Sequence, residues 1–176
     1  MKQMQSDFFE KVKLSSARRV IHGGREAVGK RKSRRPISIK KPMYIVMKSS
    51  RAEGNLRMNS KKNEERVKEL LKKQAKKFGV RILQLANLGD QLHLLLKSSS
   101  KNGFQNFLRS ITALIARFIT GAKKGKVFGR FWDFLAFSQI LQSRREFRKV
   151  ADYILAITEY LRGRKFVFNI TTLRGS

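Results

Sequence analysis

The run at residues 91–96, with the sequence QLHLLL, constrains the fold of this chain more than any other feature. Successive side chains of a β-strand point to opposite faces of a sheet. The leucines at the even positions therefore share one face, which we expect to pack beneath helices. Gln91 and His93 share the other face, where an amide and an imidazole are both suited to bind a divalent metal ion. A strand histidine held by surface hydrogen bonds is the alternative interpretation.

Apolar periodicity, capping residues and glycine stops predict the remaining elements. In chain order they are a strand at 43–47, a helix from Ser60 to about 78, strands at 80–88 and 91–96 joined by a turn at Gly89-Asp90, a helix from about 102 to 120, a strand at 134–141, and a helix from Ser143 to about 161. This order is that of a ferredoxin-like split βαβ sandwich. We predict an α+β fold whose antiparallel sheet has helices on one face, with one added C-terminal helix. The other sheet face is expected to be open for ligands.

The charge balance is strongly basic. Lys and Arg number 41 against 12 Asp and Glu, which gives a formal net charge of +29. Such a field attracts polyanions, of which nucleic acid is the commonest. Membrane-surface binding fits less well, because the basic residues are spread along the whole chain and not gathered on one amphipathic helix. No segment approaches the ~20 apolar residues of a membrane span, so we expect a cytoplasmic, nucleoid-associated protein with no membrane partner.

Composition divides the chain into three segments. Residues 1–40 are rich in charge and poor in aliphatic side chains, which predicts a flexible basic arm or a solubilising tail. Residues 41–163 form the predicted domain, with order beginning near Pro42, and 164–176 form a short tail. The candidate nucleic-acid-binding cations lie in the arm, on the second predicted helix and in the loop after it: Arg31, Lys32, Arg34, Arg35, Arg109, Arg117, Lys123, Lys124, Lys126 and Arg130.

Aromatic side chains are interleaved with the last of these cations. Phe128, Phe131 and Trp132 surround Arg130 in the sequence. Aromatic rings among cations are typical of surfaces on which unpaired bases stack. Each of the three is also compatible with a place in the core, and for Trp132 a core position is the preferred interpretation.

Tyr153 is the candidate nucleophile. At about 100° per residue, the apolar stripe of the last predicted helix runs through Phe147, Val150 and Ile154, and Tyr153 falls to one side of it. We therefore expect a partly exposed phenol that reaches a neighbouring surface. An ordinary tyrosine at the edge of a core is the alternative.

Several of these segments together resemble a known family. They are the strand Gly89–Leu96, the turn Gly121–Gly125, the segment Gly129–Trp132, and Tyr153 on the late helix. They resemble the His-hydrophobic-His endonucleases, in the single-tyrosine branch that includes the REP-associated transposases. The similarity runs from about residue 22 to about residue 163. It implies a domain that processes single-stranded or hairpin DNA, in which two histidines bind Mg²⁺ or Mn²⁺ and the tyrosine becomes joined to a 5′ phosphate.

The resemblance carries over residue by residue with two departures. His93 matches the second histidine and Tyr153 the nucleophile, but Gln91 stands where the first histidine is expected. Ile157 lies one turn after Tyr153, where the family places a polar ligand. Because two of three metal ligands are altered, impaired catalysis and a non-catalytic, domesticated DNA-binding protein both remain open. A basic RNA- or ribosome-associated protein is the third interpretation, and a homodimer is compatible with the family.

Overall fold

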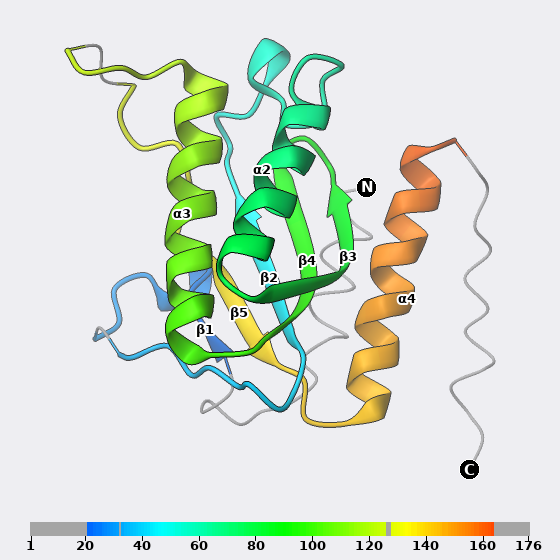
Figure 1. The fold of residues 1–176 in the computed structure, drawn as a ribbon. Helices are drawn as coiled ribbons and strands as arrows, with labels where there is room; N and C mark the ends of the chain where they lie inside the picture. Colours follow the sequence, from blue (N-terminus) through cyan, green and yellow to red (C-terminus); the bar gives the residue numbers. More distant parts are fainter. Residues whose placement is uncertain (1–20, 32, 126–127, 164–176) are drawn as a thin grey trace.

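The computed structural model describes residues 21–31, 33–125 and 128–163. Within them, five strands form one antiparallel sheet in the order β1-β5-β2-β4-β3, with three α-helices packed against it (Figure 1). The strands are β1 (Ile21–His22), β2 (Met43–Lys48), β3 (Val80–Asn87), β4 (Gln91–Ser98) and β5 (Phe137–Ile140). The α-helices are α2 (Glu64–Lys77), α3 (Lys101–Thr120) and α4 (Arg144–Leu161), and two 3-10 turns are η2 (Arg25–Ala27) and η3 (Gly54–Leu56).

The topology confirms the predicted α+β fold. Helix α2 connects β2 to β3, helix α3 connects β4 to β5, and β3 and β4 form the predicted hairpin. β2 lies in the sheet between β4 and β5 and is antiparallel to both. Each βαβ unit therefore encloses a strand of the other unit, which is the split arrangement of a ferredoxin-like sandwich.

One sheet face packs beneath α2 and α3, as the leucine alternation predicted. Leu92, Leu94 and Leu96 are fully buried on this face. Their partners come from both helices and include Val67, Leu71, Phe104, Phe107, Ile111 and Ile115, all of them almost fully buried. Burial of apolar area at roughly 25 cal/mol per Å² makes this cluster the main source of stability.

The opposite face is covered by α4 over part of its area, so the expected open face is wrong there (Figure 1). A second apolar cluster joins strand residues to buried α4 residues: Tyr44, Val46, Ala86, Leu88, Leu95, Leu141, Val150, Tyr153, Ile154 and Ile157. Leu95 lies on the same face as His93. That face is therefore partly apolar, and its apolar side chains, like those of the leucine face, are stabilised by a covering element that excludes water.

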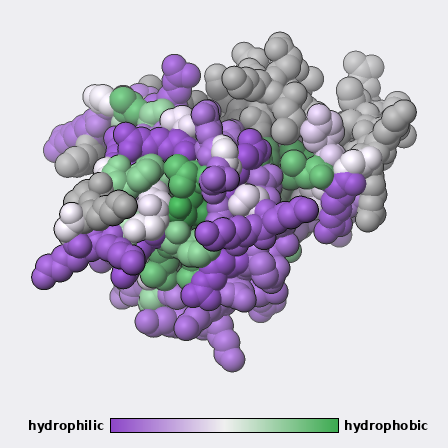
Figure 2. All heavy atoms as spheres, turned by 90° about the horizontal axis from the view of Figure 1, so that it is seen from above, coloured by the Kyte–Doolittle hydropathy of each residue, from purple (hydrophilic) through white to green (hydrophobic). Residues whose placement is uncertain are grey.

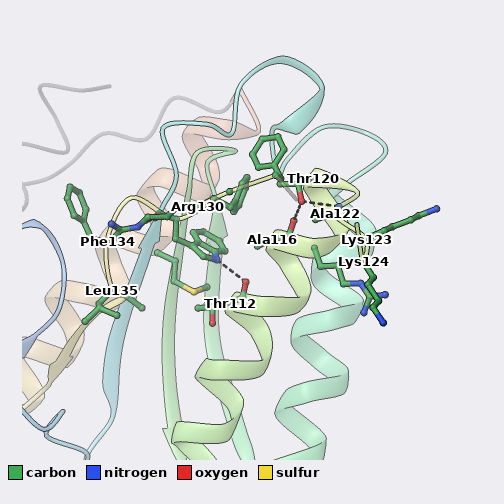
Figure 3. Close-up of a pocket in the computed structure, with 16 residues that line it drawn as sticks. Thr112, Ala116, Thr120, Ala122, Lys123, Lys124, Arg130, Phe134 and Leu135 are labelled. Atoms are coloured by element: carbon green, nitrogen blue, oxygen red, sulfur yellow. Dashed lines mark hydrogen bonds between the residues drawn. The ribbon is translucent and has the colours of Figure 1, made fainter. Parts of the chain in front are cut away.

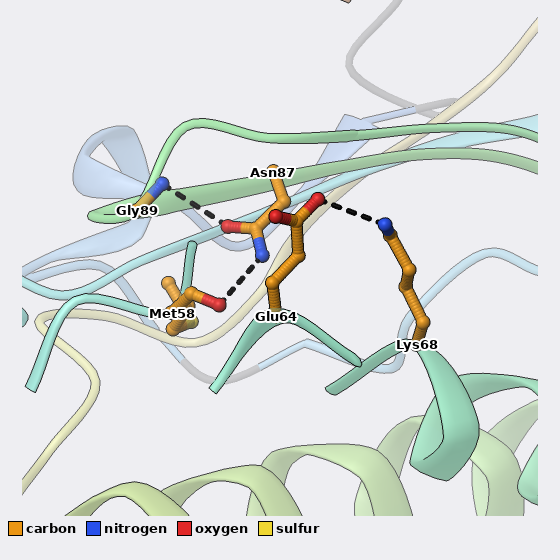
Figure 4. Close-up of polar contacts among 5 residues, drawn as sticks. All are labelled: Met58, Glu64, Lys68, Asn87 and Gly89. Carbon is orange, nitrogen blue, oxygen red and sulfur yellow. Dashed lines mark hydrogen bonds and ion pairs between the residues drawn. The ribbon is translucent and has the colours of Figure 1, made fainter. Parts of the chain in front are cut away.

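The β3–β4 turn fixes the register of the strand that carries His93. Gly89 adopts φ +97°, a conformation that favours glycine. The Asn87 side chain donates to the carbonyl of Met58 at 2.8 Å and accepts from the Gly89 N–H at 3.1 Å (Figure 4). A Cβ on Gly89 would lie 2.4 Å from Asn59 Oδ1. The turn predicted at Gly89-Asp90 is thus confirmed, and neighbouring loops hold it in place.

Several predicted boundaries differ from the structure, and β5 begins at Phe137, three residues later than the strand predicted at 134–141. Helix α2 begins after Asn63 and not at Ser60, because residues 60–63 form a turn in which the Ser60 carbonyl accepts from the N–H of Asn63. The sheet also starts before Pro42, since β1 pairs with β5 through Ile21–Gln139 and His22–Ser138. Residues 1–20 of the predicted arm and the tail 164–176 lie outside the described residues. No helix in the described ranges is long and apolar enough to cross a membrane.

Candidate functional site

The second sheet face and α4 bring His93 and Tyr153 into contact. Their ring centroids are 5.7 Å apart with the ring planes at 69°. Tyr44 on β2 completes the group, with its hydroxyl 2.6 Å from His93 Nδ1. The two residues that the family resemblance pairs therefore lie side by side. Their roles as metal ligand and nucleophile stay predictions.

Tyr153 is buried, which corrects the expectation of a partly exposed phenol. Its side chain is 2% exposed and that of His93 is 0% exposed. The buried residues of α4 include Val150, Tyr153 and Ile157, a ladder at helical spacing turned toward the sheet. The buried stripe is therefore rotated from the one that the helical wheel predicted. The physical reason is that α4 has apolar residues over a wide arc, and its packing on β3 selects which part is buried.

Burial controls the protonation of these three residues. Desolvation lowers the pKa of His93 to about 3 and raises the pKa of Tyr153 to about 12. Desolvation, with a smaller contribution from Tyr153, raises the pKa of Tyr44. At neutral pH the imidazole is uncharged and both phenols are protonated. A protonated, buried phenol is a weak nucleophile.

The residues around His93 do not fit a divalent metal ion in this arrangement. His93 Nε2 is buried with no hydrogen-bond partner among the described residues, which leaves one nitrogen for a ligand. Gln91 is also buried on β4, but Ile157, fully buried, occupies the third position. No group of three His, Cys, Asp or Glu side chains that could hold a metal occurs in the described ranges. Burying a double charge without an anionic ligand carries a large desolvation cost.

The predicted DNA-binding cations fall into different settings. Arg117, Lys123, Lys124 and Arg130 line a groove at the end of α3. Arg109, Arg31 and Arg34 are exposed elsewhere. Lys32 and Lys126 lie outside the described residues.

Arg35 has a structural role that the sequence did not show. Its guanidinium donates to Ser138 Oγ and, at 2.8 Å, to the carbonyl of Ala136. The side chain is half-buried, and desolvation lowers its pKa to about 10. It thus ties residues 33–40 to β5, and its predicted contact with DNA stays a prediction.

The groove combines aromatic side chains with cations. It has a volume of about 720 Å³ and is formed by β2, the last turns of α3 and the following loop. Its lining residues are Met47, Thr112, Ala116, Arg117, Thr120, Ala122, Lys123, Lys124, Phe128, Gly129, Arg130, Phe131, Trp132, Phe134, Leu135 and Ala136. Viewed from this end of the molecule, apolar side chains gather near the end of α3 and hydrophilic ones surround them (Figure 2). The interleaving of aromatic and basic residues was the only sequence signal of this groove.

Comparison with known proteins identifies the fold. No family model matches the chain, and no curated protein matches it. The structure of a REP-associated tyrosine transposase bound to a REP hairpin is similar, with a TM-score of 0.56 and 15% identity, over 76% of this chain and 75% of that one. A Deinococcus radiodurans R1 protein to which transposase function is attributed aligns at TM-score 0.44 and 17% identity, over 72% of this chain and 96% of that one. The likeness to the hairpin-bound transposase shows that the chain has the fold of that protein, as the resemblance implied.

Proposed function

We propose that this protein binds single-stranded or hairpin DNA through a transposase fold and does not cleave it while α4 covers the sheet. The observation that carries the proposal is the sealed contact between His93 and Tyr153 in a protein of net charge +29. The charge suits a polyanionic partner. The burial leaves no access for a phosphate at the one place where the family resemblance puts the reaction.

The available cations support DNA as the partner. Ion pairs among the described residues join Arg66 to Glu69, Lys68 to Glu64 and Arg162 to Glu159. None of them includes the cations of the α3 groove or Arg109, so no carboxylate in the part of the chain that the structure describes forms an ion pair with these side chains. The transposase of similar fold is bound to a REP hairpin, and we propose the same class of ligand for this chain.

Metal-dependent strand cleavage through Tyr153 is the second candidate. One observation favours it: the phenol lies against the imidazole that the resemblance assigns to the metal, and Nε2 of that imidazole has no partner among the described residues. Cleavage requires α4 to shift on the sheet far enough to admit DNA and a divalent ion to His93 and Gln91, while Tyr153, which α4 carries, stays beside them. A homodimer and a nucleoid location are compatible with either candidate and stay predictions.

Binding and cleavage are separable in one experiment. A labelled DNA hairpin is titrated with protein in fluorescence anisotropy, then incubated with Mg²⁺ or Mn²⁺ and run on a denaturing gel. If 6–10 phosphates are contacted, affinity falls by roughly 10³–10⁵ between 50 and 200 mM salt. Binding without a covalent adduct supports the proposal. An adduct that disappears in Tyr153→Phe supports the second candidate, and a preference for an RNA hairpin of the same sequence contradicts both.

A further inference from the structure

We propose that the groove at the end of α3 binds one unpaired nucleobase of single-stranded DNA, with the neighbouring phosphates held by the cations on its rim. This inference rests on the proposed function and specifies where DNA is bound. The groove lies on the side of the molecule formed by β2, α3 and the loop residues 122–124 and 128–136. It is distinct from the His93–Tyr153 contact, which lies between β4 and α4.

The walls of the groove suit a flat apolar ligand. The partly exposed rings of Phe128, Trp132 and Phe134 line it together with the buried Phe131 of the core, and its volume of about 720 Å³ is in the range of small-molecule sites. The rings of Phe131 and Trp132 meet edge to face at 4.9 Å. Trp132 Nε1 donates to the carbonyl of Thr112 at 2.8 Å, the contact drawn on α3 in Figure 3. The indole is therefore held in one orientation against α3.

The loop that carries these rings is held before any ligand arrives. Ser49 Oγ donates to the carbonyl of Phe131 at 2.6 Å. The carboxylate of Asp133 accepts from both the N–H and the hydroxyl of Ser50, each at 2.8 Å. The N–H of Asp133 donates to the carbonyl of Lys48 at the end of β2. A binding surface that is already ordered loses less conformational entropy on association.

Cations flank the groove on two sides. Figure 3 shows Lys123 and Lys124 on one side of the α3 end and Arg130 on the other. All described side chains that line the groove and carry a charge are basic. Phosphates on both sides of an inserted base would meet these cations, whereas an apolar peptide side chain would gain nothing from them. This charge pattern is why we assign the groove to a nucleotide.

Recognition in this groove should depend little on which base is present. The hydroxyl of Thr112 donates to the carbonyl of Leu108, and that of Thr120 donates to the carbonyl of Ala116. The indole N–H of Trp132 is also engaged. With these side-chain donors used inside the protein, aromatic stacking remains as the main attraction, and every base offers a face for stacking.

The first test uses the wild-type protein. Trp132 is the only tryptophan of the chain, so its fluorescence reports on this groove. A DNA hairpin with a single-stranded extension is compared with a series in which one extension position at a time is abasic. We expect one position at which loss of the base weakens binding by about 5- to 150-fold and abolishes quenching of Trp132. Equal affinity across the series, or DNA binding without any change in tryptophan fluorescence, overturns the proposal.

The second test uses variants with a matched control. Phe128→Leu removes an aromatic face but keeps an apolar side chain, and should remove the difference between the intact and abasic oligonucleotides or reduce it several-fold. Lys124→Ala in the groove is compared with Lys72→Ala, an exposed lysine of α2, because both lower the net charge equally. We expect Lys124→Ala alone to reduce the slope of log Kd against log salt by about one. Equal effects of the two lysine variants on a protein that still binds DNA contradict the assignment of the groove as the base-binding site, but not the proposed function. If the wild-type protein does not bind the DNA hairpin at all, the proposed function is contradicted as well.

Discussion

Protonation of His93 should destabilise the folded protein at mildly acidic pH. The imidazole is fully buried between β4 and α4 and contacts the rings of Tyr44 and Tyr153. Desolvation lowers its pKa from 6.5 to about 3. Between these two values the unfolded chain binds a proton that the folded chain does not. Stability is therefore complete above about pH 6.5 and is lost as the pH falls toward 3.

The size of the effect follows from the pKa difference. Each unit is worth about 1.4 kcal/mol, so full protonation would cost ~5 kcal/mol. At pH 5 the unfolded histidine is almost fully protonated and the folded one is neutral, so the loss relative to pH 7.5 is about 2 kcal/mol. A change of that size is a large fraction of the stability of an ordinary domain.

Urea unfolding followed by Trp132 fluorescence measures this loss. The free energy of unfolding is determined at pH 7.5 and pH 5 for the wild type and for His93→Gln. Carboxylates and His22, the other histidine of the chain, are common to both proteins, so their contributions cancel in the difference. We expect the wild type to lose about 2 kcal/mol more than the variant. Equal losses would refute the reasoning, because they would mean that solvent reaches His93 and that α4 does not seal this face.

Three further substitutions test the packing. Tyr153→Ala should lower the free energy of unfolding in urea by about 3–5 kcal/mol, because removing the ring leaves a cavity in the apolar cluster between α4 and the sheet. A loss under about 1 kcal/mol would contradict the burial of Tyr153. Gly23→Ala should lower the melting temperature more than Gly29→Ala. Both glycines have positive φ, but only a Cβ on Gly23 would meet another group, the carbonyl oxygen of Ala136 at 2.2 Å. Equal shifts in melting temperature would argue against that contact. Ser143→Ala should lower the free energy of unfolding in urea by about 1 kcal/mol, since Ser143 Oγ accepts a hydrogen bond from the Glu146 N–H at the start of α4. An unchanged free energy of unfolding would show that this cap is not formed.

The sequence by itself determined the order of the elements from β2 to α4 and the layer that α2 and α3 cover, but not the edge strand β1. Period-two alternation in residues 91–96 identified the leucine face, and Gly89 identified the turn that sets its register. Ser143 marked the start of α4. These features are local, because side-chain period, turn conformation and capping depend on residues within a few positions of one another. A ferredoxin-like sheet follows from them without knowledge of any long-range contact.

Only the tertiary structure decided the state of the site. Alternation shows that a strand has two faces, but it does not show what covers the second one. Helix α4 covers it, and this burial, not the residue types, fixes the low pKa of His93 and the high pKa of Tyr153. The α3 groove likewise combines residues from β2, from α3 and from the loop around Trp132. Desolvation and groove shape arise from segments that are distant in sequence, so no local pattern in the chain specifies them.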